Sequence, residues 1–124
     1  MNVLLVALGG ALGSVLRYGA GVLSLRLFGP AWPVGTLFVN VTGSFLMGLL
    51  VEAIARRLGA SAELRLFLTT GLLGGYTTFS AFSLDALALY ERGEVASAAL
   101  YVGASVLLGL AAIAAGLALG RQIF

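Results

Sequence analysis

Long apolar segments alternate with short polar ones along the chain, and this pattern predicts an all-α integral membrane protein. The apolar segments cover approximately residues 2–28, 34–55, 64–90 and 95–119. A helix needs roughly 20 predominantly apolar residues to cross the hydrocarbon core of a bilayer. Because the segments fill nearly the whole chain, we expect residues 1–124 to form a single membrane domain with four transmembrane helices.

The polar stretches between the segments contain residues that end helices or favour the membrane surface. The first segment stops at residues 29–33, where two prolines flank Trp32. The loop at residues 59–63 offers Ser61 as a helix N-cap. The N-terminal segment lacks a basic start and continues past Arg17, so we expect a membrane span rather than a cleaved signal peptide.

The third apolar segment is too long and too rich in glycine for one straight span. Its roughly 27 residues would extend about 40 Å as a helix, against a hydrocarbon core of about 30 Å. Gly74, Gly75, Thr77 and Thr78 lie in its middle. We therefore predict a helix break near Gly74–Thr78 that lines a binding or permeation site, because unpaired backbone groups are tolerated at membrane depth only against protein or water. A plain structural kink is the other interpretation.

Composition and charge exclude several classes of protein. Hydrophobic residues make up 60% of the 124 residues and charged residues 10%, whereas about a quarter of the residues of a soluble protein are charged. The chain has no His and no Cys, which removes imidazole ligands, thiolate chemistry and the usual general base. The net charge of +2 forms no basic patch for nucleic acid. We expect neither an enzyme nor a nucleic-acid-binding protein.

The arginines distinguish the two ends of the predicted bundle only weakly. Four lie at the end with the second loop and the C-terminus and two at the other end: Arg56, Arg57, Arg65 and Arg121 against Arg26 and Arg92. Because orientation follows the excess of Arg and Lys in short loops, this bias allows insertion in both directions. We expect an antiparallel, dual-topology homodimer.

The spans carry a few polar and aromatic side chains with two interpretations each. Asn40 offers two N–H donors, either to an anion or to a neighbouring helix. Phe79 and Phe82 are neighbours on one helix face; they form part of a packed core or turn their positive ring edges toward an anion. The predicted break likewise offers carbonyls for a cation such as Na⁺ and the first N–H groups of a half-helix for an anion.

Small residues in the first and fourth spans predict helix contacts. Gly9–Gly13 and Gly116–Gly120 are GxxxG pairs, a weak signal for close packing. Tyr101, Ser105 and Gly109 follow at steps of four residues and form a thin polar strip.

Three charged side chains lie within or near the spans. Arg17 is costly at membrane depth and is expected to face an aqueous vestibule or to pair with Asp85. Glu52 is expected to pair with Arg56 at i, i+4. A proton-relay role for the two acids is the alternative.

Three motifs in order resemble the CrcB/Fluc fluoride channels: Gly9–Tyr18, Gly35–Phe45 and Gly74–Ser83. The resemblance covers all four spans. It implies a passive channel that exports F⁻ from the cytoplasm across the inner (plasma) membrane, built as an antiparallel homodimer with two pores. It also implies a structural Na⁺ at the dimer centre, held by the backbone carbonyls of Gly74 and Thr77 from both subunits.

The same resemblance implies the residues of the fluoride route. Arg17 belongs to the vestibule, and the pore is lined by one amide, two phenylalanines, three serines and one tyrosine: Asn40, Phe79, Phe82, Ser80, Ser83, Ser105 and Tyr101. Gly109 stands where the family commonly has a hydroxyl. Two other functions stay open, namely a small proton-coupled multidrug-type exporter that relies on Asp85 and a membrane assembly subunit without transport.

Overall fold

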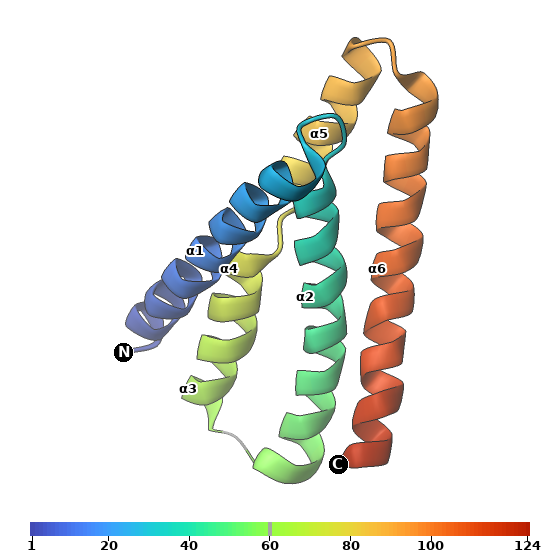
Figure 1. Ribbon diagram of the computed structural model, residues 1–124. Coiled ribbons are helices and arrows are strands. Elements are labelled where there is room, and N and C mark those ends of the chain that lie inside the picture. The colour runs from blue at the N-terminus through green and yellow to red at the C-terminus, as the bar shows by residue number, and fades with distance from the viewer. Residues whose placement is uncertain (60) are drawn as a thin grey trace.

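The computed structural model describes residues 1–59 and 61–124, and within these residues every regular element is helical. Figure 1 shows the elements in chain order. Their bounds are α1 Asn2–Phe28, α2 Val34–Ala53, η1 Ile54–Leu58, α3 Ala62–Arg65, η2 Leu66–Leu73, α4 Gly74–Tyr76, α5 Phe79–Glu91 and α6 Val95–Ile123, where η1 and η2 are π-helical turns continuous with their neighbours.

Three helical stretches of the described chain are long and apolar enough to cross a membrane: Asn2–Phe28, Val34–Arg57 and Val95–Ile123. The all-α fold is therefore confirmed. The third apolar segment is divided at Thr77 and Thr78 into two shorter helical pieces. Neither piece reaches the length of a span by itself.

The helix ends follow the predicted signals with small differences. α1 ends at Phe28 as expected, because Gly29 adopts a φ of 75° that other residues rarely take. Ser61 caps α3 by accepting a hydrogen bond of 3.2 Å from the Leu64 N–H, although Ala60 of the predicted loop lies outside the described residues. The last helix continues to Ile123, beyond the expected end near residue 119.

α2 and α6 lie side by side (Figure 1), and glycines bring their backbones into contact around Gly48 and Gly116. A Cβ atom on Gly48 would collide with the Ile113 carbonyl, and one on Gly116 with the Phe45 carbonyl. A Cβ on Gly120 would lie 2.6 Å from Cβ of Glu52. The contact predicted from the Gly116–Gly120 pair is confirmed, with α2 as the partner.

A second glycine contact joins α1 to η2 and α4. A Cβ on Gly9 would lie 2.6 Å from the Phe67 carbonyl oxygen, and one on Gly13 would collide with the Leu72 carbonyl. From the other side, a Cβ on Gly75 would lie 2.6 Å from the Gly10 carbonyl oxygen. The contact predicted from the Gly9–Gly13 pair is thus confirmed, and it fixes where α1 crosses the third segment.

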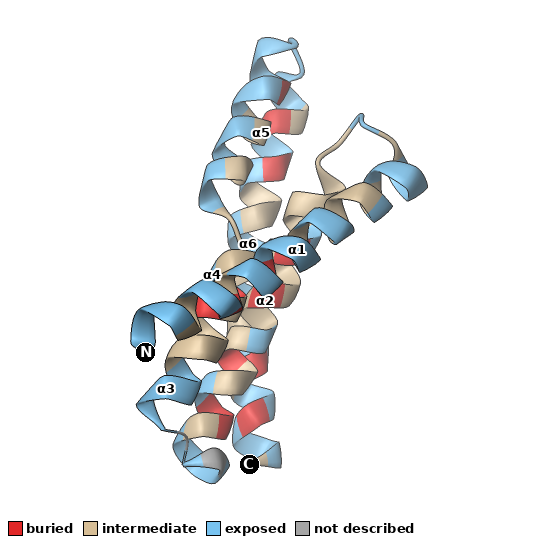
Figure 2. Cartoon of the chain, turned by 90° about the vertical axis from the view of Figure 1, so that its left-hand side faces the viewer, coloured by how far each residue is buried: buried red, intermediate tan, exposed pale blue. Residues whose placement is uncertain are grey.

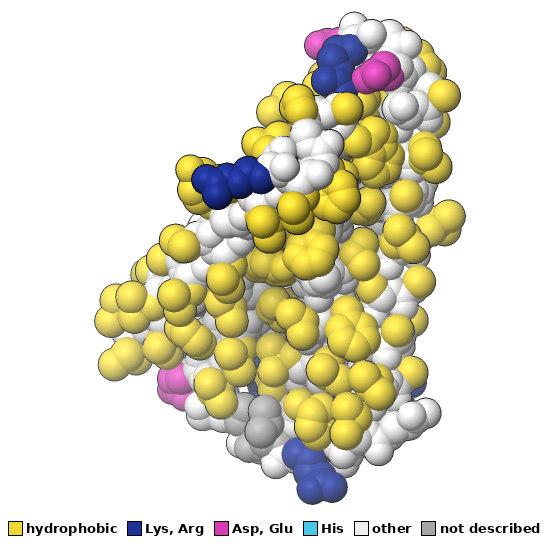
Figure 3. Space-filling model, in the orientation of Figure 1, with side chains coloured by type: hydrophobic (Ala, Val, Ile, Leu, Met, Phe, Trp, Pro, Cys, Tyr) yellow, Lys and Arg dark blue, Asp and Glu magenta, His cyan; other side chains and the backbone are white. Residues whose placement is uncertain are grey.

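Few side chains of the described chain are buried. Val39, Leu89 and Tyr101 are the largest fully buried side chains, and Figure 2 shows buried positions only along the lines where helices meet. Large apolar side chains cover most of the visible surface (Figure 3). Such a surface suits lipid or another protein chain rather than water.

The glycine contact between α2 and α6 leads to a stability prediction. Gly116→Ala should destabilise the protein by about 1–3 kcal/mol, because the added methyl meets backbone that must move apart. Gly103→Ala is the matched control on α6, since nothing lies within 4 Å of a Cβ there, and it should be neutral or stabilising by roughly 0.5–1 kcal/mol. Thermal unfolding in detergent measures both; equal stability of the two variants would contradict the contact.

Candidate functional site

The predicted helix break lies at Thr77 and Thr78. Thr77 has φ −91° and ψ 160°, and Thr78 has φ −154° and ψ 122°, so both residues are extended. α4 ends at Tyr76 and α5 begins at Phe79. The break falls within the predicted region but is shorter than expected, because Gly74 is still helical.

The glycines next to the break serve close packing. Gly75 lies against the backbone of Gly10 on α1. Gly43 on α2 faces the break, where a Cβ would collide with the Thr77 methyl group and lie 3.2 Å from the Tyr76 ring. Two helices therefore approach the break more closely than side chains would permit.

Asn40 holds the break through two hydrogen bonds to one residue. Its Nδ2 donates to the Thr78 carbonyl at 2.9 Å, and its Oδ1 accepts from the Thr78 N–H at 2.8 Å. The interpretation of Asn40 as a bond between helices is thus supported. Because an amide nitrogen carries two hydrogens, one donor of Asn40 remains for another acceptor.

Arg17 reaches the break from α1. Its Nε donates to the Gly75 carbonyl at 3.1 Å, so a cation stands at the carbonyl end of α4, where the helix dipole is negative. The expected alternative pairing with Asp85 is not formed; Asp85 instead accepts a hydrogen bond from the Tyr101 hydroxyl at 3.3 Å.

Hydroxyl groups gather at the start of α5. The Thr78 Oγ1 caps the helix by accepting from the Ala81 N–H at 3.1 Å, and it lies 3.4 Å from the Ser80 Oγ. The Ser83 hydroxyl donates to the Phe79 carbonyl one turn earlier at 2.9 Å. These local bonds arrange hydroxyls around the beginning of a helix whose first N–H groups attract negative charge.

Four aromatic rings form a continuous row from α5 to the loop after α1. The ring centroids of Phe79 and Phe82 are 5.6 Å apart, those of Phe82 and Tyr101 5.3 Å, and those of Trp32 and Tyr101 5.3 Å. Tyr101 is fully buried, whereas Phe79 is 78% exposed. The sequence predicted the Phe79–Phe82 pair but not that Trp32, predicted only as a loop residue at the membrane surface, completes the row.

The polar strip on α6 faces α2. The Ser105 Oγ is buried and has no hydrogen-bond partner within the described part of the chain. A Cβ on Gly109 would lie 3.9 Å from the Ser44 Oγ of α2. The Ser44 hydroxyl therefore lies beside the position on α6 where the chain has glycine in place of a polar side chain. A second interhelical bond, which joins the hydroxyl groups of Thr42 and Tyr76 at 2.8 Å, was not predicted.

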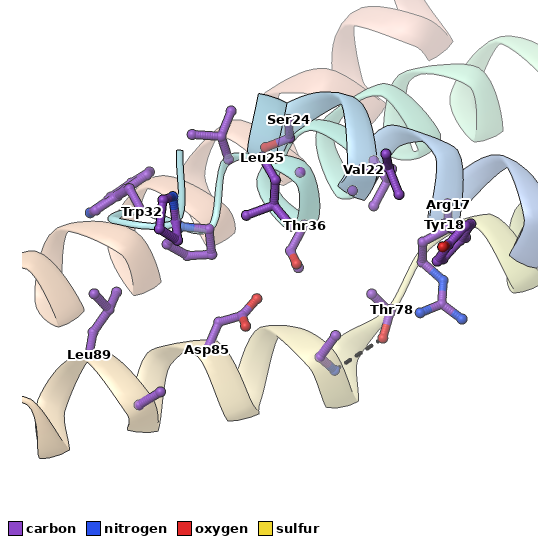
Figure 4. Close-up of a pocket in the computed structure, with 18 of the residues that line it drawn as sticks. Arg17, Tyr18, Val22, Ser24, Leu25, Trp32, Thr36, Thr78, Asp85 and Leu89 are labelled. Atoms are coloured by element: carbon purple, nitrogen blue, oxygen red, sulfur yellow. Dashed lines mark hydrogen bonds between the residues drawn. The ribbon is translucent and has the colours of Figure 1, made fainter. Parts of the chain in front are cut away.

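A cavity of about 670 Å³ lies between the C-terminal half of α1, the following loop and α5. Asp85 projects into it from α5 and faces Thr36, while Arg17 and Thr78 lie at its other end (Figure 4). Arg92 also lines it. The cavity therefore connects a charged mouth with the break.

Glu52 lies far from this cavity, in an ion-pair cluster at the opposite end of α2. The expected bond to Arg56 is confirmed at 2.8 Å, and Arg121 of α6 adds a second ion pair at 3.0 Å. With two arginines on its carboxylate, Glu52 fastens α2 to α6. Arg121 was not predicted as a partner of Glu52, because the two residues lie far apart along the chain.

A metal at the break would need backbone ligands. The described residues contain no group of three or more His, Cys, Asp or Glu side chains that could hold a metal. The Thr78 N–H, which in a continuous helix would donate to the Gly74 carbonyl, donates instead to the Asn40 Oδ1. Carbonyl oxygens at the end of a broken helix fit Na⁺. Two carbonyl oxygens from one chain would fill only part of the coordination shell of the ion and would leave positions for ligands from elsewhere.

The two bonds of Asn40 lead to a prediction about the break. Asn40→Leu should lower the free energy of unfolding by about 1–3 kcal/mol, because it removes both side-chain hydrogen bonds to the half-buried backbone N–H and C=O of Thr78. Ser83→Ala removes a hydroxyl bonded only within its own helix and should change stability by less than about 0.5 kcal/mol. Thermal unfolding, together with hydrogen exchange at Thr78, measures the effect; an unchanged exchange rate would contradict it.

Sequence comparisons place the chain among known proteins. The family model described as CrcB-like protein, Camphor Resistance (CrcB), matches residues 4–117. A protein of Agrobacterium fabrum strain C58 named fluoride-specific ion channel FluC is 62% identical over 124 residues, which cover 100% of this chain and 99% of that protein. Relatives of the same name from Rhizobium etli strain CIAT 652 and Rhizobium meliloti strain 1021 are 61% and 62% identical, over 96% and 98% of this chain and 95% and 98% of their own. With its long apolar helices, the chain is a multi-pass membrane protein that belongs to the CrcB family.

Proposed function

We propose that this protein is a fluoride-selective ion channel through which F⁻ leaves the cytoplasm passively across the inner (plasma) membrane. The observation that carries the proposal is the 62% identity, over the full length, to a relative named fluoride-specific ion channel. The relatives are named as channels, and a passive route needs no catalytic group. The absence of His and Cys from the sequence agrees with this.

The aromatic row supports a route for a small anion. Fluoride is small and strongly hydrated, so its water must be replaced by close, positively polarised groups along the whole path. The edges of aromatic rings carry such positive charge, and Phe79, Phe82 and Tyr101 lie in series. Ring edges bind weakly enough for the ion to leave again, which conduction requires.

Polar groups beside the row provide the hydrogen-bond donors. The second N–H of Asn40 and the buried Ser105 hydroxyl are available. The Ser80 hydroxyl lies at the start of α5, and the Ser83 hydroxyl, which donates to the Phe79 carbonyl, would turn from that carbonyl to the anion. Arg17 lines the cavity that leads to the break. In this proposal its charge raises the local concentration of anions at the end of the cavity next to the break.

The open surface around the break supports a homodimer of two antiparallel copies. Phe79 is 78% exposed in a single chain, so one copy by itself does not enclose a pore. In the proposed dimer each chain contributes four membrane segments, the third formed by its two shorter pieces, and the assembly holds two pores. Exposed apolar side chains on α1, α2, α3, α5 and α6 provide surface for both lipid and the second copy.

The proposed dimer also holds a structural Na⁺ at its centre. The proposed ligands are the carbonyl oxygens of Gly74 and Thr77, two from each copy. The helix break supplies such oxygens in the manner of other membrane cation sites. When bound, the ion fixes the two breaks relative to each other.

The pore proposal is tested by removing the two rings. Phe79→Ala with Phe82→Ala should reduce F⁻ efflux from proteoliposomes, measured with a fluoride electrode, by roughly thirtyfold. Two edge contacts of about 1 kcal/mol each correspond to that factor. Cl⁻ serves as the comparison ion and should not pass through the wild-type protein at a measurable rate.

Phe38→Ala is the control for the double variant, since Phe38 is exposed on α2 and is not part of the aromatic row. It should leave efflux unchanged. Full efflux in the double variant would remove Phe79 and Phe82 from the pore, and a wild-type protein without F⁻ efflux would refute the function.

The dual topology is tested with a single cysteine, because the chain has none of its own. Ala31→Cys, in the loop between α1 and α2, should be labelled to about half by an impermeant maleimide added outside intact cells and fully after permeabilisation. Labelling of all or none of the intact-cell protein would indicate one orientation and contradict the antiparallel dimer.

A further inference from the structure

The carbonyl groups around the break are not equally available to a ligand. The Leu73 carbonyl accepts hydrogen bonds from the Thr77 N–H at 3.0 Å and the Thr77 hydroxyl at 2.9 Å. The Gly75 carbonyl accepts from Arg17 at 3.1 Å and the Thr78 carbonyl from Asn40 at 2.9 Å. Among the described residues, hydrogen bonds thus occupy the Leu73, Gly75 and Thr78 carbonyls. The Gly74 carbonyl loses its usual helical donor, the Thr78 N–H, to Asn40, and the Thr77 carbonyl lies in the extended segment, so both can accept a ligand.

Arg17 reaches Gly75 because of how α1 packs. The backbones of Gly10 and Gly75 are in contact, with a Cβ on Gly75 lying 2.6 Å from the Gly10 carbonyl oxygen. Arg17 lies seven positions, or about two turns, after Gly10 and therefore on the same helix face. The glycine contact consequently determines the position of the guanidinium at the end of α4.

We propose that Arg17 is a positioning residue for the Na⁺ site. By binding the Gly75 carbonyl it removes that oxygen from the possible ligands and holds the Gly75–Tyr76 peptide group, which lies between the two proposed ligand residues, Gly74 and Thr77. This inference rests on the Na⁺ site of the proposed function and adds a role for Arg17 that is separate from attracting anions. The hydrogen bond from Nε, rather than the charge, carries the positioning role.

Two variants separate the hydrogen bond from the charge. Arg17→Gln places an amide N–H on the same carbon that bears Nε in arginine, so it keeps a donor and loses the charge. Arg17→Met has similar length with neither donor nor charge. Arg26→Gln, an exposed arginine on the same helix, is the control for loss of charge.

The readout is the rise in melting temperature that Na⁺ causes in the purified full chain, with choline at equal ionic strength as the comparison. We expect wild type, Arg17→Gln and Arg26→Gln to respond alike. Arg17→Met should need about tenfold more Na⁺ for half of the stabilisation, as expected for a weakened ligand site. Fluoride efflux is measured on the same preparations and should fall in both Arg17 variants because both lack the charge.

Two results would overturn the proposal: an unchanged Na⁺ response in Arg17→Met, or loss of the response in Arg17→Gln. Loss of the Na⁺ response in Arg17→Gln overturns the proposal even where Arg17→Met does not fold. A wild-type protein that conducts F⁻ but shows no Na⁺ response refutes the positioning role alone. A wild-type protein with a Na⁺ response but no F⁻ efflux refutes the proposed function and leaves the role of Arg17 standing.

Discussion

The structure depends on satisfying the backbone where a membrane helix is interrupted. An unpaired N–H or C=O costs several kcal/mol in hydrocarbon, where no water can replace the lost bond. At Thr77 and Thr78 the helical bonds end, and side chains from two other helices replace them. Asn40 binds both polar groups of Thr78, and Arg17 binds the Gly75 carbonyl. The break is therefore stabilised by side chains of α1 and α2, and it requires both helices to lie close to it.

Glycine makes that closeness possible. Gly43 leaves room for the Thr77 methyl group, and Gly75 lies directly against Gly10. In a membrane the association of helices relies on such close packing, because lipid is as apolar as the side chains. The same close packing at glycine joins α2 to α6 at Gly48 and Gly116. The ion pair between Glu52 and Arg121 adds a polar contact between the same two helices.

The break also separates two kinds of chemistry within a short distance along the chain. Before it, helix α4 ends in carbonyl oxygens, which suit cations. After it, helix α5 begins with N–H groups, hydroxyls and the ring of Phe79, which suit anions. A cation site and an anion route can therefore share one interruption without competing for the same atoms.

Features that are local along the chain could be predicted from the amino-acid sequence alone. The apolar segments gave the helices, length and Gly/Thr content gave the position of the break, and i, i+3 or i, i+4 spacing gave the pairs Phe79–Phe82 and Glu52–Arg56. The motifs gave the family. Helix geometry fixes such neighbours whatever the rest of the chain does.

Contacts between groups that are distant along the chain could not be predicted in this way and are seen only in the folded protein. Asn40 and Thr78 are 38 residues apart, and Arg17 and Gly75 are 58 apart; Arg17 was expected at a vestibule or on Asp85 and binds a carbonyl. GxxxG pairs mark a packing face but not its partner. The crossing points of the helices set these contacts, and they arise from the packing of all the helices together rather than from the spacing within any one.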